Sequence, residues 1–193
     1  MANPGALLTA APQTKPSVGD HIEAIGFGQA QLTTVLIAIA GTSFMEGSEV
    51  MLSNLMTIPV ATEFGLSDRE RAGIASVAYA GMVLGVLVSG NLGDIGRRRP
   101  VVWGFFLALC SCLGCAAAPN YWILLFCRFF QGVGFMFSFG PACSMASETS
   151  PVWYRIPVQA LSVYMYSFGM ISVSVVAYLD DPTLQALHWR KLM

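Results

Sequence analysis

Charged residues are scarce in this chain. They make up 11% of its 193 residues, whereas a soluble globular domain carries about 25%. Hydrophobic residues account for 55%, and the mean hydropathy is +0.62. Too little polar surface is left to coat a water-soluble globule of this size, so we expect lipid to surround most of the chain. The formal net charge is −1, which gives no basic field that would attract nucleic acid.

Histidine is scarcer still, because the chain has only His21 and His188, one near each end. The five cysteines all fall inside apolar runs. One Cys-x-x-Cys pair, Cys112 and Cys115, lacks the second pair or histidine cluster that would complete a metal site. We interpret the cysteines as small apolar membrane residues. No Ser/His/Asp set or phosphate-binding loop is placed to form an active site. We therefore expect a protein that is not an enzyme and has no catalytic residues, metal or cofactor.

The N-terminal region, residues 1–30, lacks the marks of a secretory signal. It has no basic n-region and no sustained apolar stretch before its prolines. We expect this region to form a flexible cytoplasmic tail, with the first membrane helix acting as the insertion signal.

Long apolar runs are what the sequence has in abundance. A bilayer core about 30 Å thick requires about 20 residues of helix, and five segments between residues 31 and 180 qualify. They predict an all-α, polytopic transmembrane bundle, followed by an extracytoplasmic tail at 181–193. Small residues such as Gly81 and Gly85 would let these helices approach closely in lipid. The predicted helices are 32–59, 73–92, 101–118, 121–146 and 157–179.

The connections between these segments determine the expected orientation. Ser67 and Glu70 have the spacing of a capping box and predict a helix start. The dipeptide at 119–120 (Pro-Asn) requires a tight hairpin. Residues 97–99 are three adjacent arginines in a short turn, and such turns stay on the inner side of a membrane. We therefore expect a multi-pass integral membrane protein with a cytoplasmic N-terminus, in the plasma membrane or an organelle membrane.

Three charged residues lie inside the predicted helices. Glu46 and Glu49 are one turn apart in the first, and Arg128 is in the fourth. Charged groups are costly inside a bilayer, so they face a bundle interior or a water-filled path. One interpretation is a structural ion pair between Arg128 and a glutamate. The other is a solute or proton pathway, which Asn54 and Gln131 would help to line, unless these two amides are ordinary hydrogen-bond partners between helices.

Two motifs resemble signatures of the major facilitator superfamily. The stretch GNLGDIGRRR at 90–99 resembles the loop G-x-L-a-D-r-x-G-r-[rk]-x, which lies between the second and third helices of that family. Here Ile95 stands where the family usually has a basic residue, which removes one ion-pair partner for Asp94. The stretch RFFQGVG at 128–134 resembles the fourth-helix signature R-x-x-x-G-x-G.

Further matches point to a branch of this family. Glu148, Pro151 and Arg155 resemble the E-x-x-P-x-x-x-R pattern of organic ion and sugar transporters. The segment 26–31 (GFGQAQ) is most similar to the synaptic-vesicle-protein-like and organic ion transporter branch. The segment 188–190 (HWR) resembles the G-W-R that opens the sixth helix in that branch.

The resemblance implies a fold of two six-helix halves that rock about a site at the bilayer midplane. This chain would hold the first five helices, a partial N-terminal half, and would lack the sixth helix and the second half. The resemblance also implies an inner gate, in which an aspartate and neighbouring charges latch the inner side shut. The residues implied for this gate are Gly90, Asp94, Gly96, Arg97, Arg98, Glu148 and Arg155.

These observations lead us to expect a secondary active transporter of a small organic solute that works by alternating access. The acidic first helix is compatible with proton-coupled transport. It is equally compatible with a cationic solute and with an anionic one. The expected pathway residues are Glu46, Glu49, Asn54, Arg128 and Gln131. We expect the chain to be an incomplete fragment that needs the missing C-terminal half for transport. The alternative is a non-transporting structural or regulatory membrane remnant that binds a partner.

Overall fold

A computed structural model of the chain describes residues 18–26, 28–92, 96, 98–182 and 188–192. Within these ranges every regular element is helical, which confirms the predicted all-α class. Five helical stretches are long and apolar enough to cross a membrane, as the apolar runs predicted. They are Gln29–Leu55, Asp68–Gly90, Arg98–Ala116, Tyr121–Thr149 and Val152–Asp180.

The first span is less regular than the single helix predicted over 32–59. It contains a six-residue π-helical stretch, and the helix breaks at Met56 before it continues beyond the span. Pro59 explains the break, because its ring clashes with the carbonyl four residues earlier and it donates no hydrogen bond. Gly65, with φ of 64°, then ends the last piece in the left-handed conformation. The pieces are α2 (Gln29–Val35), η2 (Leu36–Gly41), α3 (Thr42–Leu55) and α4 (Thr57–Phe64).

The capping box predicted ahead of the second span is present. The Ser67 backbone N–H donates to Glu70 Oε2 at 2.9 Å, and the Glu70 N–H donates to Ser67 Oγ at 3.4 Å. This cap starts α5 (Asp68–Leu92), several residues before the predicted start at residue 73. Residues 68–72, which the prediction left outside the second helix, are therefore part of α5.

The remaining spans also extend beyond the apolar runs. The tight hairpin expected at 119–120 joins α6 (Arg98–Ala116) to α7 (Tyr121–Thr149). Helix α8 (Val152–Asp180) begins after the extended Pro151, whereas the prediction began it at Pro157. Pro157 lies inside this helix, in its second turn, where it removes one backbone hydrogen bond without ending the helix. Glu148 and Arg155 consequently lie in helices α7 and α8, not in the loop between them.

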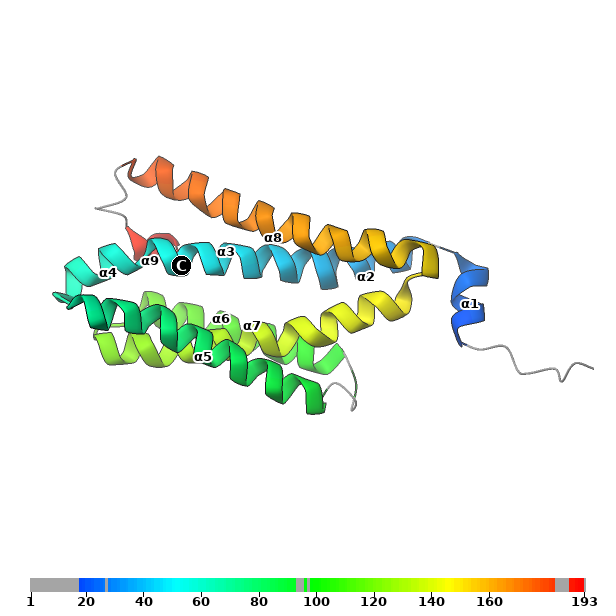
Figure 1. Cartoon of the computed structure of the whole chain (residues 1–193), viewed down its shortest axis with the longest axis horizontal. Helices are drawn as coiled ribbons and strands as arrows, with labels where there is room; N and C mark the ends of the chain where they lie inside the picture. The colour runs from blue at the N-terminus through cyan, green and yellow to red at the C-terminus, as the bar shows by residue number, and fades with distance from the viewer. Residues whose placement is uncertain (1–17, 27, 93–95, 97, 183–187, 193) are drawn as a thin grey trace, which may run out of the picture.

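The spans form two groups (Figure 1). Helix α7 packs along both α5 and α6, and α3 packs along α8. Glycines make both groups tight. A Cβ atom added at Gly81 or Gly132 would overlap backbone across the α5–α7 contact, and one added at Gly47 or Gly169 would overlap backbone across the α3–α8 contact. This is the close approach that small residues allow in lipid.

Short helices flank the spans at opposite ends of the bundle (Figure 1). Helix α1 (Val18–Ile25) lies within the region predicted as a tail. At the far end, α9 (Trp189–Leu192) is held by Glu63. Trp189 Nε1 donates to Glu63 Oε2 at 2.8 Å, Arg190 pairs with Glu63 Oε1, and the Arg190 guanidinium lies over the Trp189 ring. The hydrogen bond from Arg190 holds the pKa of Glu63 below its usual value of 4.5.

Candidate functional site

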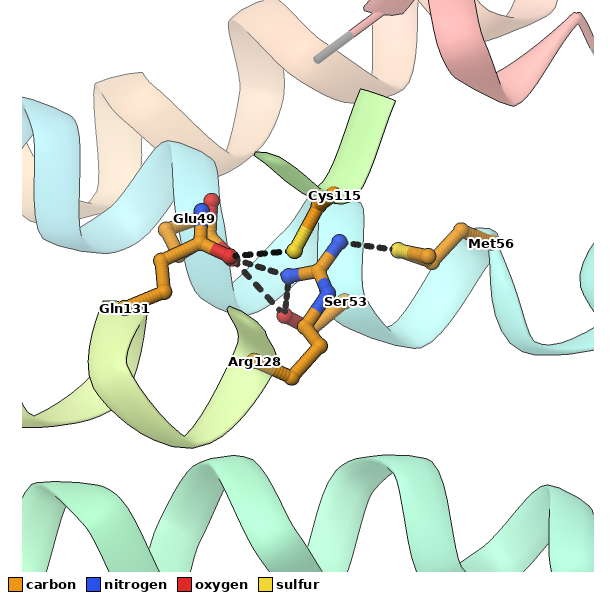
Figure 2. A network of polar contacts seen from close by, with 6 residues as sticks. All are labelled: Glu49, Ser53, Met56, Cys115, Arg128 and Gln131. Atoms are coloured by element: carbon orange, nitrogen blue, oxygen red, sulfur yellow. Dashed lines mark hydrogen bonds and ion pairs between the residues drawn. The ribbon is translucent and has the colours of Figure 1, made fainter. Parts of the chain in front are cut away.

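A buried ion pair joins the two helix groups near the middle of the spans. Arg128 of α7 reaches α3, where its Nη1 donates to the Glu49 carboxylate and, at 2.9 Å, to Ser53 Oγ. Its Nη2 is directed at Met56 Sδ (Figure 2). The Arg128 side chain is 0% exposed and Glu49 is 7% exposed. Of the two glutamates that the sequence offered, the structure therefore pairs Arg128 with Glu49.

Helical spacing explains why α3 presents these partners together. Glu49 and Ser53 are four residues apart and share one face. Ser53 Oγ also donates to Glu49 Oε1 at 3.2 Å, and Met56 follows on the next turn. An uncompensated buried charge is strongly destabilising, and a partner with satisfied hydrogen bonds offsets that cost. The site thus holds an arginine–carboxylate pair in a largely apolar interior.

Gln131, one turn beyond Arg128, extends the polar network toward α6. Its Oε1 accepts a hydrogen bond from Cys115 Sγ at 3.5 Å. Its Nε2 is buried and has no hydrogen-bond partner among the described residues. Buried amide nitrogens are normally paired, so this donor is a specific feature of the site.

A cavity of about 240 Å³ adjoins the ion pair. Helices α3, α6, α7 and α8 all contribute to its wall, which is mostly apolar. Glu49, Cys112 and Gln131 are polar members of the wall, and Phe44 and Phe135 are its aromatic members. Arg128 lies behind Glu49 and outside the wall. A small, largely apolar molecule could occupy this space and touch the polar network at its edge.

The structure brings three of the five predicted pathway residues to one place: Glu49, Arg128 and Gln131. Glu46 lies one turn earlier on α3, half-buried and outside the cavity wall, on the side of Cys143 and Tyr166. Asn54 is exposed and is also outside the cavity wall.

Sequence reasoning missed four members of the site. Ser53 could have been found, because it lies four residues after Glu49. Cys112 and Cys115 were interpreted as small apolar residues, but the first lines the cavity and the second donates to Gln131. Nothing in the sequence around Met56 marks it as a contact of Arg128.

The described residues of the predicted inner gate all lie at one end of the bundle, where α5 and α7 end and α6 and α8 begin (Figure 1). Gly96 has a φ of 144°, which favours glycine in the turn. Arg155 Nε donates to Ser150 O, at the end of α7, at 3.3 Å. Arg98 and Glu148 are exposed, as is Gly90. Asp94 and Arg97 lie outside the described residues.

No group of three or more His, Cys, Asp or Glu side chains within the described ranges is placed to hold a metal ion. The polar groups of the site are instead a charge pair, an amide, a hydroxyl and thiols. This set suits hydrogen bonding to an organic molecule.

Known proteins resemble this chain over most of its length. A profile of the Major Facilitator Superfamily matches residues 32–180. The "Putative transporter svop-1" of Caenorhabditis elegans is 26% identical over 179 residues, covering 92% of this chain and 33% of that protein. The gentisate transporter of Corynebacterium glutamicum is 28% identical, covering 86% of this chain and 37% of that protein. The organic cation/carnitine transporter 7 of Arabidopsis thaliana is 30% identical, covering 93% and 35%.

This chain therefore spans about a third of the length of these relatives. The family match overlaps all five spans and includes the buried ion pair. With its five apolar spans, the chain is a multi-pass membrane protein, and it belongs to the Major Facilitator Superfamily.

Proposed function

We propose that this chain serves in secondary active transport of a small organic solute, with Glu49, Arg128 and Gln131 on the solute pathway. The observation that carries the proposal is the buried Glu49–Arg128 pair beside a cavity of about 240 Å³. Ionisable residues inside a membrane mark substrate or ion pathways. Because the chain spans about a third of its relatives' length, we assign transport to a carrier with a second helical half, against which this bundle rocks.

The position of the ion pair also supports a role in a second movement, between the two helix groups of this bundle. Glu49 belongs to the α3–α8 group and Arg128 to the α5–α6–α7 group. A change in the angle between the groups must stretch or re-form this contact. The pair is then a switch element that differs between inward-open and outward-open states.

Glu46 is the carboxylate that we assign to proton coupling. It is half-buried on the same helix as Glu49, and no ion pair joins it to a cation within the described ranges. It can therefore gain or lose a proton without breaking the Arg128 contact. Asn54, exposed near the end of α3, is assigned to the outer mouth of the pathway.

An inner gate completes the proposal. We place it at the end of the bundle that carries Gly90, Gly96, Arg98, Glu148 and Arg155, and we assign that end, with the N-terminus, to the cytoplasm. Adjacent arginines at 97–99 support this orientation. Asp94 and Arg97 belong to the same gate by sequence.

The names of two relatives support a small organic solute. One names gentisate and another organic cations and carnitine. These names agree in size class and differ in charge, so they do not fix the charge of the solute carried here.

Uptake by proteoliposomes holding the product of the complete gene tests the pathway. The double substitution Glu49→Leu with Arg128→Met removes both charged groups and fills their space with apolar side chains. A pathway role predicts a folded protein that transports nothing, whereas a purely structural pair predicts uptake at the parental rate. Ser138→Ala is the matched control, because Ser138 is buried on α7 and its hydrogen bonds to described residues stay within its own helix.

Proton coupling is tested separately with Glu46→Gln. We expect the dependence of uptake on external pH to disappear in this variant. Uptake with an unchanged rate and pH profile rules out Glu46 as the proton carrier and leaves the solute pathway untouched.

A further inference from the structure

An apolar groove lies on the surface of the α5–α6–α7 group. Helix α7 contributes the half-buried Val133 and Phe137, α5 contributes Val88 to one side, and four residues of α6 form the other side. The groove has a volume of about 410 Å³, and its lining side chains are hydrophobic. It shares no lining residue with the cavity at the ion pair, so it is a separate feature of the bundle.

Close backbone packing on α7 produces this groove. Helices α5 and α6 both pack along α7 (Figure 1). A Cβ atom added at Gly85 of α5 would overlap backbone at Val133, and one added at Gly104 of α6 would overlap backbone at Gly134. The two helices therefore lie against the same turn of α7, and the groove between them is fixed by main-chain contacts.

The groove is placed to contact lipid acyl chains. Its lining residues all belong to helices that are long and apolar enough to cross a membrane. The rings of Trp103 and Phe106 on α6 are 65% and 59% exposed. An acyl chain can cover these rings without desolvating a polar group. The apolar wall by itself, however, does not distinguish one lipid headgroup from another.

Two arginines at the start of α6 supply that distinction. Arg99 lies four residues before Trp103, and Phe106 and Cys110 follow at helical spacing, so these four residues share one face. Arg98 precedes them, and both arginines are exposed. Among the residues that the structure describes, no acidic side chain forms an ion pair with either arginine.

The length of this face matches one leaflet of a membrane. Eleven residues of helix separate Arg99 from Cys110, which corresponds to about 16 Å along the axis. One leaflet contributes about half of a hydrocarbon core about 30 Å thick. Helical side chains lean toward the helix N-terminus, so Arg99 extends away from the groove and toward the membrane surface where α6 begins.

We infer that this groove binds an acyl chain of an anionic phospholipid, and that Arg99 and Arg98 hold the phosphate of its headgroup. The guanidinium group pairs well with phosphate, and basic residues at the cytoplasmic end of membrane helices attract anionic lipids. Arg99 is not among the residues of the proposed inner gate. The inference therefore adds a lipid site that is distinct from both the gate and the solute pathway.

Quenching of Trp103 fluorescence by brominated lipids tests the inference. The other tryptophans, Trp122, Trp153 and Trp189, are replaced by phenylalanine. The chain is reconstituted in vesicles of equal amounts of phosphatidylcholine and phosphatidylserine. In one series the acyl chains of phosphatidylserine carry bromine, and in the other those of phosphatidylcholine do. Because bromine quenches an indole only at close contact, the two series give the relative affinities of the two lipids for the groove.

We expect phosphatidylserine to bind beside Trp103 roughly 25-fold more tightly than phosphatidylcholine, because each of two arginines near the membrane surface contributes about fivefold. Arg99→Gln should reduce this preference about fivefold, and Arg98→Gln combined with Arg99→Gln should abolish it. Arg69→Gln is the matched control. Arg69 is exposed at the start of α5, at the opposite end of the bundle, and its loss should leave the preference unchanged.

The possible outcomes each bear on one part of the inference. Equal affinities for the two lipids in the parent overturn the anionic class. A preference that survives the double substitution overturns the role of the arginines. If neither brominated lipid quenches Trp103, another helix or a second copy of the chain covers the groove, and the lipid site is wrong.

A second measurement applies if the single-tryptophan chain does not fold. Cys110 lines the groove and is exposed. Its protection from N-ethylmaleimide can be read by mass spectrometry in the parent chain, in vesicles of phosphatidylcholine with or without phosphatidylserine. We expect slower labelling of Cys110 when phosphatidylserine is present, and an unchanged rate would overturn the inference.

Discussion

Replacing Glu49 by leucine should destabilise the bundle severely, although leucine is more lipid-like than glutamate. The reason is Arg128, which is 0% exposed and would lose its counter-charge. Its contacts with Ser53 Oγ, at 2.9 Å, and with Met56 Sδ are to uncharged groups and do not replace that charge. Breaking a buried pair by removing one partner costs about 3–5 kcal/mol. That corresponds to a loss of roughly a hundredfold to a few thousandfold in the ratio of folded to unfolded protein.

The double variant Glu49→Leu with Arg128→Met sharpens this prediction. Once both charges are gone, no ion remains to be desolvated, and apolar replacements of similar volume are neutral or stabilising by about 1–4 kcal/mol. We therefore expect the second substitution to rescue the first. If the two substitutions were independent, the double variant would be at least as unstable as Glu49→Leu.

Reversible unfolding in mixed micelles, titrated with sodium dodecyl sulfate, measures these stabilities. Tryptophan fluorescence can follow the transition, because the chain has four tryptophans and Trp189 is buried. A Glu49→Leu variant within about 1 kcal/mol of the parent would refute the argument that Arg128 remains charged and buried. A double variant no more stable than the single one would refute it as well.

Three further predictions concern packing, capping and pH. Gly132→Ala should lower the free energy of unfolding by about 1–3 kcal/mol in the same titration, because the new methyl group overlaps backbone of α5. Gly90→Ala, with open space around the new methyl group, is the control and should keep the stability of the parent. Ser67→Ala should cost about 0.5–2 kcal/mol through loss of the α5 cap, and hydrogen exchange should rise at the start of α5 only. Because the folded-state pKa of Glu63 is lowered, its contribution is present above about pH 4.5 and is lost as pH falls through the lowered value. Fluorescence of Trp189, with the other tryptophans changed to phenylalanine, should show this step, and Glu63→Gln should abolish it.

The fold class followed from the sequence because the signal for membrane helices is long and redundant. Twenty apolar residues make an unmistakable run, and errors of a few residues at the ends do not change it. Local breaks were harder to predict. Pro59 broke the first helix three residues before itself, whereas Pro157 was accepted inside α8. Pro141 likewise lies inside α7, so the presence of a proline does not by itself predict where a membrane helix breaks.

The sequence predicted part of the candidate site. Glu49 and Arg128 stand out because charge is costly in lipid, and their sequence separation of 79 residues was no obstacle to pairing them. The choice between Glu46 and Glu49 required three dimensions, since both lie on nearly the same face of α3. The sequence did not predict the roles of Cys112, Cys115 and Met56, because sulfur-containing side chains are common apolar residues in membrane helices.

The glycine contacts determine where this bundle can yield to force. Within each group, helices touch backbone to backbone at Gly81 and Gly132 or at Gly47 and Gly169, so sliding there would drive main-chain atoms into each other. Between the groups, side chains meet, and these can change rotamer. The bundle should therefore deform most easily along the boundary between the two groups, which the Glu49–Arg128 contact crosses. A mutation that makes this boundary more rigid should slow the motion of one group relative to the other without altering the structure of either.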